Sequence, residues 1–248
     1  MTAPPTIDPS DPQALVNELF GDDRWAKDQF AQHVSNQVLE LSNALAVCFR
    51  LVAPLNDVAN RTEEIRAAYV SGFTFGVLDD IVVSAKLLLT GKISAAGNLM
   101  RQAGEGIALA ILCSSVRPLI VQKQKRKEVK GLFWELLKND DKCTRGHRAI
   151  EVLEWNAAAL GVNANAIERL KEAKEHYNQF SHCGKVTIAC RMALDQVGKG
   201  FIGGEFDEAK LDGYRAELAS RIALCKVLPD FMRRMTAILT PPAAEVRS

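Results

Sequence analysis

Apolar side chains recur along most of this chain at steps of three and four residues, the spacing of one face of an α-helix. The clearest run lies between residues 22 and 52, directly before Pro54, which is expected to end that helix. The pattern therefore predicts an all-α helical bundle. Further helical runs cover residues 56–89, 94–111, 128–138, 144–160 and 207–239, and another extends from Asn163 or Asn165 to about Phe180.

One stretch interrupts the helical pattern. Residues 186–190 are rich in side chains that favour strands, and four glycines follow between positions 198 and 204. Such a composition is typical of a short strand followed by turns. The sequence therefore predicts a small β-hairpin or irregular insert near residues 185–206.

The two ends of the chain differ from its middle. Four prolines fall within the first dozen residues, which predicts a flexible leader over residues 1–12. Residues 241–248 are mostly small or polar and predict a flexible tail. No repeat or long linker divides the remainder, so residues 13–240 are expected to form a single α-helical domain.

Composition narrows the class of protein. The 248 residues carry 31 basic and 30 acidic side chains, and a net charge of +1 gives no general attraction to nucleic acid or membranes. No run of eighteen uncharged apolar residues occurs, so we expect no membrane span. Six cysteines lack the spacing of a disulfide framework, which predicts reduced thiols and a cytoplasmic protein. Neither CxxC nor HExxH occurs, and we expect neither a metal site nor a cofactor.

The first candidate site is the pair Arg101 and Glu105, one helical turn apart among small and apolar residues. Charges on such a face must be paired, because an isolated buried charge is costly. Asp79 and Asp80, in the preceding predicted helix, are placed to meet Arg101 across the helix interface. A solvated pair of modest energy is the alternative.

The second candidate site is the predicted helix end that contains His176 and His182. Histidine titrates near neutrality and suits general acid–base chemistry. The two histidines lie about 120° apart around a helix, so they share a ligand only if the helix ends first. Tyr177 and Asn178 are the accompanying candidate binding residues. The alternative is that His182 hydrogen-bonds the free carbonyls at the helix C-terminus.

These two sites are expected to meet. Arg101 and Glu105 belong to a helix that should run through the centre of the bundle, and His182 lies where the chain turns over the end of another helix. We therefore predict that Arg101, Glu105 and His182 form one interior polar cluster.

A third candidate is a basic run of net charge +5 over residues 117–130. A local cluster of this kind can contact nucleic-acid phosphates on an otherwise neutral protein. A solvated connection between helices is the alternative. The candidate nucleic-acid contacts are Lys123, Lys125, Arg126, Lys127 and Lys130.

The order of these features resembles that in the HEPN-like all-α families of bacteria, over roughly residues 60–240. The resemblance depends on two segments, NLMRQAGE at 98–105 and HYNQFSH at 176–182. Active members carry an Arg, then a polar residue, and a His four to six positions after the Arg. They are metal-independent endoribonucleases and generally dimers, so the resemblance implies a homodimer with RNA or a protein as partner.

The chain departs from the family motif. Tyr177 stands where the Arg before His182 would be, while the polar Asn178 and the His are kept. This departure predicts a catalytically degenerate HEPN-like protein that binds a partner or nucleic acid, in phage defence or regulation.

Two alternatives remain open. One is an active ribonuclease in which His182 or His176 removes a proton and Arg101 or Arg169 stabilises phosphate charge. The other is a small-molecule-binding bundle, with a polar pocket lined by Asp79, Arg101, Glu105 and His182.

Overall fold

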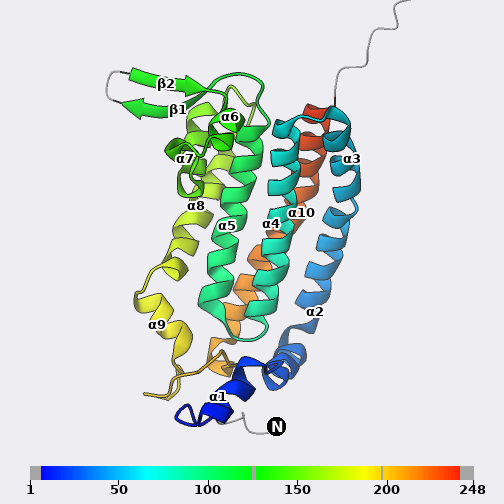
Figure 1. Ribbon diagram of the computed structural model, residues 1–248. Helices are drawn as coiled ribbons and strands as arrows, with labels where there is room; N and C mark the ends of the chain where they lie inside the picture. Colours follow the sequence, from blue (N-terminus) through cyan, green and yellow to red (C-terminus); the bar gives the residue numbers. More distant parts are fainter. Residues whose placement is uncertain (1–6, 125–126, 197, 241–248) are drawn as a thin grey trace, which may run out of the picture.

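The computed structural model describes residues 7–124, 127–196 and 198–240, and these form a helical bundle with a small two-stranded sheet. This arrangement confirms the predicted fold class (Figure 1). The long helices are α2 (Arg24–Phe49), α4 (Ile65–Leu88), α5 (Ile93–Cys113), α8 (Ala164–Ser181) and α10 (Leu211–Leu239). The shorter elements are α1 (Pro12–Leu19), α3 (Val52–Thr62), β1 (Leu119–Gln124), β2 (Lys127–Gly131), α6 (Phe133–Lys138), α7 (Gly146–Asn156) and α9 (Lys185–Arg191), with 3-10 turns η1 (Lys142–Thr144) and η2 (Glu208–Lys210).

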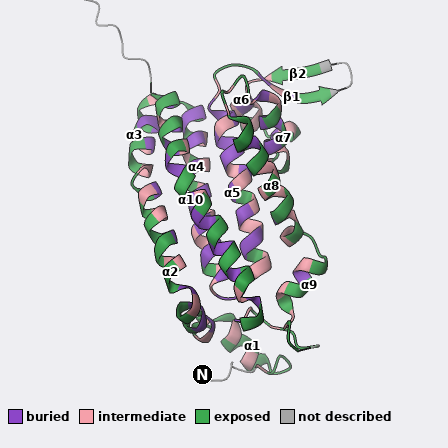
Figure 2. Ribbon diagram, turned by 180° about the vertical axis from the view of Figure 1, so that it is seen from behind, coloured by how far each residue is buried: buried purple, intermediate pink, exposed green. Residues whose placement is uncertain are grey.

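Helix α5 lies at the centre of the bundle. It packs against α4, α7 and α8, while α10 packs against α2, α3 and α4. The buried faces of these helices point inward in Figure 2. Two groups of buried apolar side chains form the core, and Ile111, Leu170 and Phe231 pack against both groups. The core is therefore continuous from one end of the bundle to the other.

The first long helix ends earlier than the predicted run over residues 22–52. Helix α2 ends at Phe49 and is kinked at Val34, whose φ is −135°. Pro54 does not end this helix but lies in the first turn of α3, where its missing N–H has no helical partner to lose. Glu63, with φ at +51°, then separates α3 from α4, so the predicted single helix over residues 56–89 was also wrong.

The strand expected at residues 186–190 was wrong, because this segment forms α9. The side chain of Thr187 accepts a hydrogen bond from the Gly184 N–H at 2.8 Å and so caps the helix. A strand here would need a neighbour to satisfy its backbone groups, and the described residues place none beside it. The following segment is irregular, as expected, with one isolated bridge between Met192 and Gly200.

The hairpin is instead formed by β1 and β2, at residues 119–131. For this region the sequence predicts a connection followed by the start of a helix. Leu119 and Val121 are only 3% and 2% exposed, whereas Ile120 is half-buried and Gln122 is exposed, so one face of β1 is anchored in the core. The Asn156 side chain fixes the outer edge of β1 by accepting from the Ile120 N–H at 2.9 Å and donating to its carbonyl at 2.8 Å. These contacts are tertiary and do not follow from local sequence.

Two helical stretches, Arg24–Thr62 and Ile65–Leu88, are long and apolar enough to cross a membrane by length and composition alone. Core helices of soluble proteins and signal sequences meet the same criterion. Helix α4 is one of the central helices of this bundle and contributes Val77, Leu78 and Ile81 to the core.

Candidate functional site

Arg101 and Glu105 form the expected ion pair, at 2.5 Å between Nη1 and Oε1. Their side chains are only 21% and 11% exposed, so the pair is largely buried. The Arg101 Nε donates to the Ser181 Oγ at 2.9 Å, and Nη2 donates to the Asn98 Oδ1 at 3.3 Å. Ser181 in turn donates to the same Asn98 oxygen at 2.9 Å. The guanidinium thus joins α5 to the C-terminal end of α8.

Two glycines make room for this cluster. A Cβ at Gly97 would lie 2.5 Å from the Cγ of Phe180, so only glycine lets α8 approach α5 closely enough for Ser181 to reach Arg101. A Cβ at Gly146, the first residue of α7, would lie 2.8 Å from the Glu105 Oε2. The carboxylate therefore lies against the N-terminus of α7, where the helix dipole favours negative charge.

Asp80 of α4 and the Arg101–Glu105 pair line one groove of about 380 Å³ between α4 and α5. No ion pair joins Asp80 to Arg101 among the described side chains, although the predicted approach of the two helices is present. Burial, together with the smaller effect of the neighbouring Asp79 charge, raises the pKa of Asp80 from 3.8 to about 6. The groove is completed by Gly72, Phe73, Gly76, Val77, Gln102, Gly106 and Leu109.

His182 does not join this cluster. It is exposed, it is the C-cap residue of α8, and its backbone carbonyl accepts a hydrogen bond from Thr187 at 3.4 Å. The predicted interior cluster of Arg101, Glu105 and His182 was therefore wrong in its third member. Ser181 takes that position, because α8 ends there and the chain then turns away. Asp79 is exposed as well.

His176 belongs to a different polar group, which connects α8 to α10. Its Nε2 lies 2.9 Å from the Glu217 Oε1, and the Glu217 Oε2 accepts from the Arg221 Nη1 at 2.8 Å. Arg221 is fully buried and also donates to the Ser84 Oγ at 2.8 Å. About half of the His176 side chain is exposed, so this polar group extends from Arg221 in the core, through Glu217, to the surface.

Tyr177 is a buried residue of the core, only 4% exposed. Its hydroxyl has no hydrogen-bond partner of ordinary geometry within the described residues. Burial raises the pKa of Tyr177 to about 12, and the charge of Glu217 contributes in the same direction. Asn178, the next candidate, is partly buried.

The basic run forms the projecting β1–β2 hairpin. Lys123 and Lys130 are exposed, and the Lys123 ammonium lies 5.6 Å from the centre of the Trp155 ring. Lys130 is 4.0 Å from Glu128. Lys125 and Arg126 lie outside the described residues, and Lys127 begins β2.

Four residues of these groups were not predicted from the sequence: Asn98, Ser181, Glu217 and Arg221. Glu217 and Arg221 have the same i, i+4 spacing as the other buried pair, on the apolar side of α10. The same argument from spacing that predicted the Arg101–Glu105 pair could therefore have predicted this one. Ser181 and Asn98 carried no signal, because serine and asparagine are common at helix ends and surfaces.

The chain matches no protein-family model, no curated protein and no solved structure in comparisons with known proteins.

Proposed function

We propose that this protein binds the phosphate backbone of nucleic acid through the end of the bundle that carries the β1–β2 hairpin. RNA is the form to which the HEPN-like resemblance points. The observation that supports the proposal most directly is the projection of the hairpin beyond the bundle (Figure 1), with its lysines on a surface that a long polymer can reach.

The uneven distribution of charge supports the same surface. Residues 117–148 carry ten basic and four acidic side chains, which leaves 21 basic and 26 acidic elsewhere. These residues form β1, β2, α6, η1 and the start of α7, elements that contact one another at one end. A neutral chain with one basic end attracts a polyanion locally, since each neutralised phosphate releases bound counterions. Exposed bases in this region outside the hairpin are Arg117, Lys138, Lys142 and Arg145.

Binding without cleavage is the form of this function that the site residues favour. Arg101 is held by Glu105, Ser181 and Asn98 within the protein, His182 is exposed outside that cluster, and His176 is paired with Glu217. The residues considered for ribonuclease chemistry thus belong to separate groups. A catalytic unit needs its base and its cation around one phosphate.

The test is the anisotropy of a fluorescently labelled single-stranded RNA titrated with the protein, over roughly 50 to 200 mM salt. Affinity should fall steeply with salt. The double variant Lys123→Gln, Lys130→Gln should bind more weakly, and its logarithmic salt slope should be shallower by about 1.4, since each lost phosphate contact contributes about 0.7.

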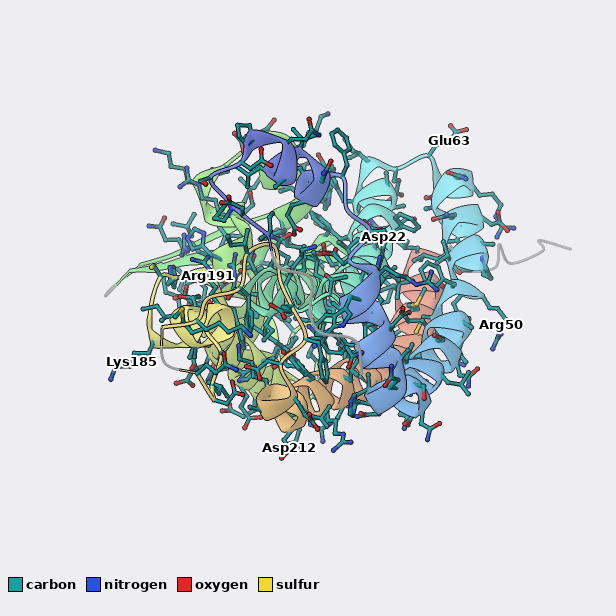
Figure 3. All side chains as sticks on the ribbon, turned by 90° about the horizontal axis from the view of Figure 1, so that it is seen from below. Asp22, Arg50, Glu63, Lys185, Arg191 and Asp212 are labelled. Atoms are coloured by element: carbon teal, nitrogen blue, oxygen red, sulfur yellow. The ribbon has the colours of Figure 1, made fainter. Side chains whose placement is uncertain are left out.

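A matched control removes two lysines from the opposite end. Lys86 lies in the last turn of α4, and Lys185 points outward at the periphery of the molecule (Figure 3). The variant Lys86→Gln, Lys185→Gln should bind RNA like the parent. Equal loss in both double variants, or no salt-dependent binding, would contradict the proposal. The same RNA incubated in EDTA should stay intact, and cleavage there would favour the ribonuclease alternative.

A further inference from the structure

A groove of about 850 Å³ is lined by residues of α5, α8 and α10. The floor is made by Met100, Gly104 and Ile107 of α5. The groove follows α10 from Ser220 to Met235, a length of about 22 Å at 1.5 Å per helical residue. This volume falls within the range of small-molecule sites in proteins.

The walls of the groove are apolar. Leu170 and Ala173 of α8 face Leu224, Val227 and Phe231 of α10 across it. Val227 is 52% exposed although it is a large aliphatic side chain. Contact with a second apolar surface would remove this exposed area from water, which is the main favourable term in binding.

Small residues keep the groove open. A Cβ at Gly104 would meet nothing within 4 Å, so the floor has space that the protein does not use. Ala166, Ala173 and Ala223 also line the groove, where larger side chains would fill it. Cores are normally packed without such gaps.

Cationic side chains line the groove, and one of them is unpaired. Arg169 is exposed and makes no ion pair or hydrogen bond within the described part of the chain. The Arg234 guanidinium, which also lines the groove, donates to the Gly161 carbonyl at 2.9 Å. Two carboxylates are present as well, but Asp230 is paired with Arg233 at 2.7 Å and Glu172 is exposed. Arg169 therefore remains free to bind an anion.

We propose that this groove binds a single-chain anionic amphiphile of the long-chain carboxylate class. The acyl chain lies along the floor of α5, and the carboxylate pairs with the Arg169 guanidinium, which can grip two oxygens at once. The site is separate from the hairpin, so this inference does not depend on nucleic-acid binding.

The test measures direct binding of palmitate by calorimetry, with hexadecyl phosphate and hexadecanol as companions. Palmitate should bind saturably. Arg169→Gln should weaken palmitate binding about tenfold and leave hexadecanol unchanged, because only the anion uses the guanidinium. Arg169→Lys should restore part of the loss. Tighter binding of hexadecyl phosphate than of palmitate would overturn the carboxylate assignment, while a neutral alcohol that binds as tightly would overturn the role of Arg169.

Two variants fill the groove from opposite walls. Gly104→Leu and Ala223→Leu should each abolish palmitate binding and keep the thermal melt of the parent. Gly213→Leu is the matched control, because a Cβ at Gly213 also meets nothing within 4 Å but the residue does not line the groove. No saturable binding to the parent protein, or unchanged binding to both filled variants, would overturn the proposal.

Discussion

Two of the arginines with little solvent exposure each have a carboxylate and a hydroxyl partner. Arg221 has no exposed surface and is held by Glu217 and Ser84, while Arg101 is held by Glu105 and Ser181. The desolvation of an ion is only offset when its hydrogen bonds are satisfied. These groups therefore constrain how α4, α5, α8 and α10 fit together, whatever ligand the surface binds.

Removal of one partner from the Arg101 pair should be strongly destabilising. We expect Glu105→Ala to lower the free energy of unfolding by about 3 kcal/mol, because it leaves a buried guanidinium without its carboxylate. Urea denaturation measures this. The matched control is Asp28→Ala, which breaks an i, i+4 pair with Arg24 whose side chains are 55% and 76% exposed. Asp28→Ala should lower the free energy of unfolding by at most about 0.5 kcal/mol. If the two variants lost the same free energy, the Arg101–Glu105 pair would not be buried.

Asp80 should titrate near neutrality. Its pKa of about 6 lies above the ordinary 3.8, so the folded chain holds this proton more tightly than the unfolded chain does. The contribution of Asp80 to stability is therefore greatest below pH 4 and declines as pH rises towards about 6. Carboxyl NMR shifts followed against pH measure the value directly. Asp79→Asn should lower the pKa of Asp80 but leave it above 3.8, since burial is the larger cause.

The rate at which each cysteine reacts with a thiol reagent should depend on its exposure. All six cysteines are free, and burial raises the pKa of Cys113 and Cys225 to about 12. Cys183 is exposed. In native protein a thiol reagent should therefore label Cys183 first, and denatured, unreduced protein should yield six reactive groups. Mass spectrometry of the labelled peptides identifies the site, and a Cys183→Ser protein that keeps the fast phase would refute the assignment.

At the scale of elements, position in the fold decided between helix and strand. Residues 186–190 have strand-forming side chains but form α9, because the Thr187 cap is local and no strand lies beside them in the described chain. The β1–β2 hairpin forms where two apolar side chains reach the core and Asn156 satisfies the backbone edge. Strand propensity depends on such neighbours.

The Asn156 contact can be tested on its own. Asn156→Ala removes two hydrogen bonds to Ile120 and one to the Val152 carbonyl, and it leaves backbone groups of β1 unsatisfied. We expect a loss of about 2 kcal/mol in stability and faster exchange of the Ile120 amide hydrogen. Asn139→Ala, at an exposed helix end, serves as control and should alter neither quantity. An Ile120 amide that exchanges at the parent rate would contradict the role given to Asn156.

At the scale of the whole molecule, one central helix organises the core. Because most of the described residues lie in helices and only β1 and β2 form a sheet, the far-ultraviolet circular dichroism spectrum should be dominated by helix with a minor strand signal. A spectrum dominated by strand would contradict the architecture. Grooves lie on two sides of α5, and the amphiphile is proposed to occupy the one lined by α8 and α10, while nucleic acid is proposed to bind the separate β1–β2 hairpin.

The sequence by itself determined the all-α class, most of the long helices and the pairing of Arg101 with Glu105, because these depend on spacing within one segment. A period of 3.6 residues places apolar side chains on one face, and a charge on that face needs a partner one turn away. Only the tertiary structure decided that Ser181 rather than His182 completes the cluster, that His176 pairs with Glu217, and that the strands form at residues 119–131. Each of these outcomes joins residues far apart in the chain. Which distant groups meet depends on how whole helices pack, and a pattern within one segment carries no information about that.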